Sequence, residues 1–117
     1  MVTNMQRGEV WWVDFEPSIG SEIQKKRPAI VVSNNINNEN SNRVVVVPLT
    51  LSTHKCYPSE ALITVIKKSE GHTKSKAMAD QIMTADKKRL FQLMGQVSVQ
   101  DMRKVEDAIK LHLGLRK

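Results

Sequence analysis

Six short runs rich in β-branched, aliphatic and aromatic residues, separated by polar loops, constrain the fold of this chain most strongly. Runs of this length and composition predict strands, and the proline and glycine residues beside several of them mark strand ends. The predicted strands cover residues 8–15, 29–32, 44–47, 61–66, 77–82 and 93–97. Because the strands are short and outnumber the helices, we expect an α+β chain, mainly β, that folds as a small curled barrel or half-barrel with helices packed outside.

The clearest helix lies at the end of the chain. Ser98 is its predicted N-cap, Asp101 follows three residues later as in a capping box, and Gly114 is the predicted stop. His112 lies close to the apolar stripe of this helix, so we expect it to be a packed core histidine. The stripe itself is expected to lie in the core or at a dimer interface and comprises Met102, Val105, Ile109 and Leu113.

The segments between the runs predict loops, turns and a short helix. The asparagine-rich residues 33–42 predict a loop or a short irregular helix, and residues 67–76 predict a polar, basic turn. Thr84 can cap a short helix over residues 85–91. Pro48 is expected to mark the exit of the third strand, because proline cannot donate to a strand ladder.

The length of 117 residues predicts a single domain over residues 1–117, in which residues 1–7 form a loose tail. The net charge of +6 and the pI of about 9.7 favour a polyanionic partner, and a merely soluble basic protein is the simpler alternative. Cys56 is the one cysteine, which rules out an internal disulfide and fits a cytoplasmic location. Neither a membrane-spanning apolar run nor a signal peptide is evident, so we expect no membrane association.

A basic loop, G-S-E-I-Q-K-K-R-P over residues 20–28, joins the first two predicted strands. Pro28 biases Arg27 toward an extended conformation, which places Arg27 at the mouth of the second strand. A cationic loop that ends in a well-placed arginine suits a phosphate-rich ligand. An ordinary charged hairpin loop has the same composition, and this stretch alone favours that simpler interpretation.

Few residues have a spacing typical of a catalytic site. Among the three histidines, His72 lies in a polar turn, and only His54, four residues after Thr50, lies in a segment suited to function. The chain has no metal-ligand spacing, glycine-rich phosphate loop or nucleophile elbow, so we expect neither a metal nor a cofactor. Trp11 and Trp12 are adjacent and face opposite sides of their strand. One indole can therefore stack on a base, although a dimer contact or partial burial in the core is the simpler expectation.

Two strand-end residues suggest phosphoryl-transfer chemistry. If their strands pair side by side, Arg27 and Thr50 can reach one rim. RNA carries its own nucleophile, the 2′-hydroxyl, so its cleavage needs alignment, charge neutralisation and proton movement but no metal ion. Arg27 can bind a phosphate through two parallel hydrogen bonds, and Thr50 can donate to a nonbridging oxygen. A guanidinium stays protonated at neutral pH, so Arg27 is a poor general base.

Several short pieces of the sequence match one family in their order and spacing. They are V-D-F-E-P (13–17), G-S-E (20–22), R-P-A (27–29), V-P-L-T (47–50), Y-P (57–58) and A-D-Q (79–81). On these pieces, and over nearly its whole length, the chain resembles the MazF/PemK toxins of bacterial toxin–antitoxin pairs. The resemblance implies a dimeric SH3-like (CcdB/MazF-like) barrel. It also implies a metal-independent endoribonuclease that cuts single-stranded RNA, chiefly messenger RNA, at short sequences and leaves 2′,3′-cyclic phosphate and 5′-hydroxyl ends.

The same resemblance assigns roles to individual residues. The family's catalytic arginine and threonine fall on Arg27 and Thr50. The implied partner is an antitoxin whose acidic, partly disordered tail occupies the RNA groove, which suits a basic surface. We add His54 and the cations of the basic loop to the family's RNA contacts, so the expected substrate-binding residues are Ser21, Glu22, Lys25, Lys26, His54, Asp80 and Gln81.

Two departures from the family pattern concern the recognised RNA sequence. The residues after Glu22 are isoleucine, glutamine and two lysines, where the family often has glutamine and then small residues, so this loop should be less supple and more cationic. Met83 stands where the family tends to place a basic residue. Either a base or phosphate contact is absent there, or Lys25 and Lys26 replace it.

Two other functions compete with ribonuclease activity. A gyrase poison of the CcdB family has a similar fold and relies on a tryptophan and a glycine at its C-terminus, whereas this chain ends L-G-L-R-K. A non-catalytic RNA-binding barrel would explain the charge and the loops but would leave the match at both Arg27 and Thr50 as a coincidence.

Overall fold

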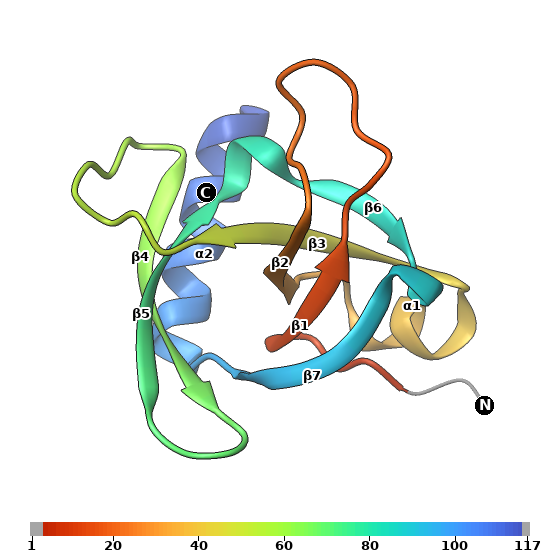
Figure 1. Ribbon diagram of the computed structural model, residues 1–117. Helices are drawn as coiled ribbons and strands as arrows, with labels where there is room; N and C mark the ends of the chain where they lie inside the picture. Colours follow the sequence, from red (N-terminus) through yellow and green to blue (C-terminus); the bar gives the residue numbers. More distant parts are fainter. Residues whose placement is uncertain (1–3, 116–117) are drawn as a thin grey trace.

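The computed structural model describes residues 4–115 and shows strands curled around a central axis with one long helix against them (Figure 1). Two α-helices, α1 (Asn35–Asn40) and α2 (Val99–Leu113), and two 3-10 turns, η1 (Ala79–Gln81) and η2 (Lys87–Arg89), join or flank the strands. The strands are β1 (Glu9–Asp14), β2 (Lys26–Val31), β3 (Arg43–Thr50), β4 (Glu60–Lys67), β5 (His72–Met78), β6 (Met83–Asp86) and β7 (Leu90–Gln96).

The antiparallel sheet closes on itself. Its strand order is β2-β1-β7-β4-β5-β3-β6, and a further pairing joins β2 to β3. The ring therefore runs through every strand except β6, which extends along the first half of β3. The ring is closed between β4 and β7 by only two residue pairs, Ile66 with Gln96 and Lys67 with Gly95. This arrangement confirms the predicted small curled barrel, mainly β, with a C-terminal helix outside it.

Apolar side chains fill both faces of the first three strands. Val10, Ile30 and Leu49 belong to a core that α2 covers, whereas Trp11 and Val13 belong to a second core on the opposite face. Two-sided burial explains why these strands are continuous apolar runs rather than alternating ones. Trp11 is buried and its neighbour in sequence is half-buried, so the two indoles face opposite sides as predicted.

Helix α2 begins and ends where its sequence predicts. The Ser98 hydroxyl accepts a hydrogen bond from the Asp101 amide at 3.1 Å, and Gly114 ends the helix at φ +70°. The apolar stripe is buried at Met102 and Val105 but not at its last position, because Leu113 is 51% exposed. His112 is exposed as well, so the prediction of a core histidine is wrong. Residues 111–113 are all exposed, so the buried part of the helix ends before its last turn.

The side chain of Asp101 differs from the predicted capping box. Its Oδ2 accepts a hydrogen bond from the Thr64 amide of β4 at 2.8 Å, and its Oδ1 lies 3.5 Å from the Lys104 ammonium. The carboxylate therefore joins α2 to an edge of β4 where no neighbouring strand accepts this amide proton.

We expect Asp101→Ala to lower the free energy of unfolding by about 1–3 kcal/mol, because the partly buried Thr64 amide would lose its acceptor. Urea denaturation of both proteins measures the difference. Asp107→Ala, which removes an exposed carboxylate from the same helix, is the matched control and should change stability by less than about 0.5 kcal/mol. Equal losses in the two variants would show that the Thr64 contact contributes nothing specific.

The predicted turn over residues 67–76 is wrong in its second half. β5 begins at His72, because residues 72–78 all pair with β4, and only residues 68–71 remain in the turn. The strand predicted over residues 77–82 is also wrong beyond Met78. There the Ala79 amide donates to the Ser59 carbonyl at 3.0 Å instead of continuing the ladder, and the next residues coil into η1.

The short helix predicted over residues 85–91 is wrong as well. These residues form the end of β6, then η2, then the start of β7. Thr84 is no cap, because it pairs with Val45 of β3, and the cap of η2 is Asp86, whose Oδ1 accepts from the Lys88 amide at 2.8 Å. Backbone hydrogen bonds to the edge of β3 stabilise residues 83–86 as a strand. Tertiary contacts of this kind override local helix propensity.

Two further predictions change near the chain ends and at a proline. Pro48 lies inside β3 rather than at its exit, because Thr50 still pairs with β5. The expected loose tail is wrong for Met5, which is 3% exposed, and for Arg7, whose guanidinium lies 2.8 Å from the Glu106 carboxylate. Residues 1–3 of that tail lie outside the described residues. Within residues 4–115, no helix has the length and apolarity needed to span a bilayer.

Candidate active site

Three polar side chains lie in one row across β2, β3 and β5. The β2–β3 pairs end at Ala29 with Pro48, so Arg27 and Thr50 each lie two residues beyond the last pair, at the same end of the two strands. Thr50 itself pairs with Lys76 of β5. Directly opposed residues of neighbouring strands point to the same face of a sheet. Thr50 and Lys76 therefore share a face, and Arg27 lies at the same end of β2; we call these three residues the row.

Arg27 and Thr50 each use only part of their hydrogen-bonding capacity within the chain. The Nε of Arg27 donates to the Gln24 carbonyl at 3.0 Å, and no described residue accepts from its two terminal nitrogens. The Thr50 hydroxyl accepts from the Ser52 amide at 3.3 Å, which leaves its own proton to donate. Both residues are half-buried. The terminal nitrogens of Arg27 and the hydroxyl of Thr50 can therefore donate hydrogen bonds to an anion.

The loop from β1 to β2 is fastened at its base. The carboxylate of Glu16 accepts from the Lys25 amide at 3.0 Å and from the Ser18 hydroxyl at 3.2 Å. Arg89 donates to the carbonyls of Asp14 and Glu16 at 3.0 and 2.6 Å. These contacts position the chain that leads into Arg27. The sequence assigned no role to either residue, although Glu16 belongs to the V-D-F-E-P motif, and Arg89 stands in no pattern that distinguishes it from a solvated charge.

Ser21 and Glu22 lie in the outer part of this loop, which projects from the barrel in Figure 1. Both residues are exposed. The Glu22 carboxylate accepts from the Ile19 amide at 2.7 Å, and the Glu22 amide donates to the Ile19 carbonyl at 3.1 Å. The glutamate therefore shapes its own turn, and its second oxygen remains open to a ligand.

The two lysines before Arg27 occupy different environments. Lys25 is exposed and has a positive φ of 68°, which is uncommon for a residue with a side chain. Lys26 is the first residue of β2, and its ammonium lies 5.6 Å from the centroid of the Phe91 ring, within the range of a cation–π interaction. Phe91 is 52% exposed. A charged and an aromatic side chain thus meet at the surface beside Arg27.

The loop between β3 and β4, residues 51–59, follows Thr50 and is held by one side chain of β5 and one of β4. The ammonium of Lys76 lies 3.2 Å from Oε1 of Glu60 and donates to the Lys55 carbonyl at 2.7 Å. The same Glu60 oxygen accepts from the Tyr57 amide at 2.9 Å. Neither Lys76 nor Glu60 was singled out from the sequence, because Lys76 stands in the segment predicted as a turn. Residues 72–76 are all polar, so no apolar alternation in the sequence indicates a strand there.

The remaining predicted contacts lie on two separate segments. His54 is exposed in the loop after Thr50, so it shares a segment with the candidate site. Asp80 and Gln81 lie on η1, which packs against β3, β4 and α2, and Asp80 is exposed. Among residues 4–115, no group of three or more His, Cys, Asp or Glu side chains could hold a metal ion.

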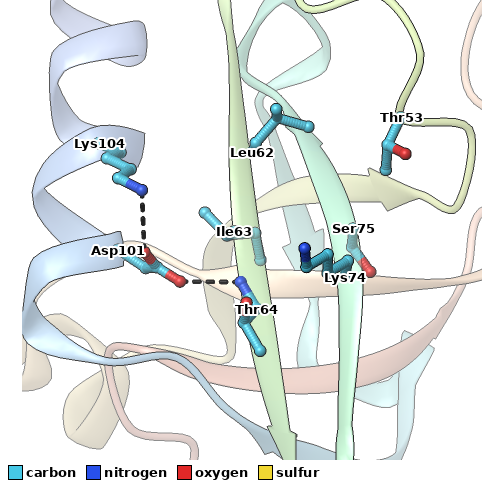
Figure 2. Close-up of a pocket in the computed structure, with 8 residues that line it drawn as sticks. All are labelled: Thr53, Leu62, Ile63, Thr64, Lys74, Ser75, Asp101 and Lys104. Atoms are coloured by element: carbon cyan, nitrogen blue, oxygen red, sulfur yellow. Dashed lines mark hydrogen bonds and ion pairs between the residues drawn. The ribbon is translucent and has the colours of Figure 1, made fainter.

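A pocket of about 350 Å³ lies beside the row, between α2 and the β4–β5 pair (Figure 2). Figure 2 shows Asp101 of α2 between the Lys104 ammonium and the Thr64 amide, with Lys74 on the neighbouring strand. Thr53 adds a residue from the loop that follows Thr50. Neither Arg27 nor Thr50 lines this pocket.

Comparison with known proteins identifies the family. Residues 6–113 match the family model described as PemK-like, MazF-like toxin of type II toxin-antitoxin system. Endoribonuclease MazF9 of Mycobacterium tuberculosis is 38% identical over 116 residues, which cover 95% of this chain and 98% of that relative. A mycobacterial endoribonuclease solved with its cognate antitoxin is 28% identical, with a TM-score of 0.75 over 97% of this chain and 98% of that one.

A further solved structure supports the fold alone. MazF from Deinococcus radiodurans is 22% identical and superposes with a TM-score of 0.81, covering 97% of this chain and 99% of that chain. The curled barrel with its C-terminal helix is therefore the MazF fold that the motifs of the sequence implied. The family match extends over nearly all described residues. This chain belongs to the PemK-like, MazF-like toxin family of type II toxin–antitoxin systems.

Proposed function

We propose that this chain is a sequence-specific, metal-independent endoribonuclease that cuts single-stranded RNA, chiefly messenger RNA, and leaves 2′,3′-cyclic phosphate and 5′-hydroxyl ends. The observation that carries the proposal is that Arg27 and Thr50 lie beyond the same end of the β2–β3 ladder and that both keep hydrogen-bond donors unused. The relative MazF9 of M. tuberculosis, named an endoribonuclease, supports the class of reaction.

The proposed reaction uses the nucleophile that RNA carries. The 2′-oxygen forms a bond to phosphorus, the bond from phosphorus to the 5′-oxygen breaks, one proton leaves the 2′-hydroxyl and one reaches the 5′-oxygen. Arg27 binds the nonbridging oxygens through its terminal nitrogens and stabilises the charge that grows on them. Thr50 donates to one of these oxygens and fixes the phosphate in line for attack. The guanidinium remains protonated throughout, so a base other than Arg27 moves the protons.

The surface beside the row supplies the proposed RNA contacts. Lys25 and Lys26 attract the backbone phosphates next to the cut, and the exposed ring of Phe91 offers a face on which a base can stack. His54 approaches from the loop after Thr50. Contacts from the outer part of the first loop and from η1 are proposed to select the bases and comprise Ser21, Glu22, Asp80 and Gln81.

The proposed partners follow from the charge of the chain and from the relatives. A net charge of +6 favours an antitoxin whose flexible acidic tail covers the RNA groove. A mycobacterial endoribonuclease of this fold has been solved with its cognate antitoxin, which supports such a complex here. We also propose a homodimer that acts in the cytoplasm on its RNA substrate.

Incubation of the purified protein with a long single-stranded RNA in excess EDTA tests the proposal. We expect discrete cuts at one short sequence, because the chemistry needs donors from the protein and no metal ion. Mapping the ends should show a 2′,3′-cyclic phosphate on one side and a 5′-hydroxyl on the other. Thr50→Val has the same shape as the wild type without the hydroxyl and should cut at least about a hundredfold more slowly.

The first RNA can lack the recognised sequence, so a second pool of random-sequence RNA is incubated in the same way. RNA that remains intact in both pools, while the protein binds it, would identify a non-catalytic RNA-binding barrel. Intact RNA together with stalled gyrase would identify a gyrase poison. Loss of all cuts in EDTA with recovery on Mg²⁺ would contradict the metal-independent mechanism.

A further inference from the structure

We propose that Lys76 is a positioning residue for RNA cleavage, which it serves by holding the loop of residues 51–59 against the barrel beside Thr50. The inference rests on the proposed ribonuclease function. It extends the site by one buried ion pair, Lys76 with Glu60, that lies next to the row of Arg27 and Thr50 without being part of the phosphate contact.

Lys76 is one of two buried lysines among residues 4–115, the other being Lys87, and its side chain is only 10% exposed. Lysine is almost never buried unless its ammonium is paired. Here the ammonium contacts one carboxylate oxygen, at 3.2 Å, and one backbone carbonyl, at 2.7 Å. The carboxylate belongs to Glu60, itself only 12% exposed, and the carbonyl belongs to Lys55 in the loop. The ammonium of Lys76 therefore interacts with protein groups rather than with solvent.

Besides this pair, the Ala79 amide donates to the Ser59 carbonyl at 3.0 Å, and the Glu60 amide donates to the Tyr57 carbonyl at 2.8 Å. Residues 51–58 are all exposed, including Leu51 at 72% and Tyr57 at 58%, so apolar burial does not fasten the loop. Its central contacts converge on the ion pair, since Lys76 holds the Lys55 carbonyl and Glu60 holds the Tyr57 amide at 2.9 Å. A segment with few buried contacts moves unless polar contacts restrain it. The pair therefore restrains the middle of the loop from both sides.

The position of the pair links this restraint to the candidate active site. Lys76 lies directly opposite Thr50, the last residue before the loop, so the anchor and the proposed phosphate donor are neighbours on adjacent strands. The loop also carries His54 and Tyr57. A misplacement of about 1 Å at a reacting group lowers a rate by about a hundredfold. Release of the loop would therefore slow the chemical step more than it weakens RNA binding.

The decisive variant is Lys76→Met with Glu60→Leu, which removes both charges and leaves neither one buried without a partner. Apolar replacement of a complete buried pair is commonly neutral for stability, so the melting temperature should stay close to that of the wild type. We expect hydrogen exchange at the Tyr57 amide to accelerate by at least about tenfold and single-turnover cleavage to slow by about tenfold to a hundredfold. Lys76→Arg keeps a cation with several donors and should retain both properties.

Binding to RNA with a 2′-deoxy nucleotide at the cut distinguishes positioning from a direct phosphate contact. A positioning residue leaves the affinity and its salt dependence unchanged, whereas a lost phosphate contact makes the slope of log K against log salt shallower by about one unit. Lys68→Met is the matched control, because it removes one exposed lysine from the β4–β5 turn, beyond the end of β5 that lies farther from Lys76, and should leave exchange and cleavage unchanged.

Three results would overturn the role of Lys76: unchanged exchange at Tyr57, unchanged cleavage, or a shallower salt slope in the double variant. The two proposals fail separately in this design. A wild type that leaves RNA intact refutes the ribonuclease function and, with it, a role of Lys76 in cleavage. An active wild type with an equally active double variant refutes the role of Lys76 alone.

Discussion

Arg27→Ala should abolish RNA cleavage, with a fall in rate of at least about a thousandfold, while the barrel remains folded. The side chain is half-buried at the start of β2 and makes one hydrogen bond to the Gln24 carbonyl, so little of the core depends on it. Its loss removes the proposed charge that binds the nonbridging oxygens. Single-turnover cleavage of the mapped RNA site, with circular dichroism as the check on folding, measures the effect.

Arg27→Lys separates charge from geometry at the same position. Lysine keeps the positive charge but cannot make two parallel hydrogen bonds to one phosphate. We expect Arg27→Lys to bind uncleavable RNA nearly as well as the wild type and still to cut it at least about tenfold more slowly. Full cleavage by Arg27→Ala in a folded protein would remove Arg27 from the mechanism.

Gly95→Ala should destabilise the fold by at least about 3 kcal/mol, the second large effect that the structure predicts. A Cβ at position 95 would lie 2.1 Å from the carbonyl oxygen of Ile66 and 2.9 Å from the Cα of Lys67. Both atoms belong to the backbone of β4, so no side chain can turn aside to make room. The added methyl group would separate β4 from β7 at the two pairs that close the barrel.

Gly71→Ala is the control for this effect. Gly71 lies in the β4–β5 turn at φ +87°, and a Cβ there would meet nothing within 4 Å. The cost is then only that of the left-handed backbone, about 1–2 kcal/mol. Denaturant unfolding of the two variants beside the wild type gives the comparison. Similar midpoints for Gly71→Ala and Gly95→Ala would show that β4 and β7 do not approach as closely as the structure indicates.

Gly95 also illustrates a limit of sequence analysis. A glycine inside an apolar run indicates a weak strand, because it has no side chain to pack. In the structure the glycine strengthens the pairing instead, because the absence of a Cβ at position 95 lets the backbone of β7 approach that of β4. Nothing in the local sequence carries this information, because the carbonyl that excludes a Cβ belongs to a strand almost thirty residues away.

The strands with buried faces were predictable, and the polar segments were not. Continuous apolar runs located β1 and parts of β2, β3 and β4, because burial selects their residues directly, and the polar first half of β2 was missed. Lys74 and Lys76 made β5 resemble a turn, although their strand is held by backbone pairing with β4. The helix predicted over residues 85–91 failed for the same reason, because the free edge of β3 converts those residues into β6.

Part of the candidate site could be identified from the sequence. Arg27 and Thr50 were singled out as strand-end donors, and short motifs linked them to one family before any geometry was known. Their alignment in one row depends on the register of β2 against β3, which no spacing along the chain specifies. The Lys76–Glu60 pair depends on a second register, that of β5 against β4, and remained invisible for this reason.

The sequence by itself determined the class of fold, the capped final helix, the basic surface and the family, because each of these depends on composition, local spacing or short motifs. Only the tertiary structure decided the closure of the barrel, the extent of β5 and β6, and the neighbours of Thr50. Hydrogen bonds between strands join residues that lie far apart along the chain. Their partners are chosen when the whole sheet forms, and the row of Arg27, Thr50 and Lys76 exists only as a consequence of that choice.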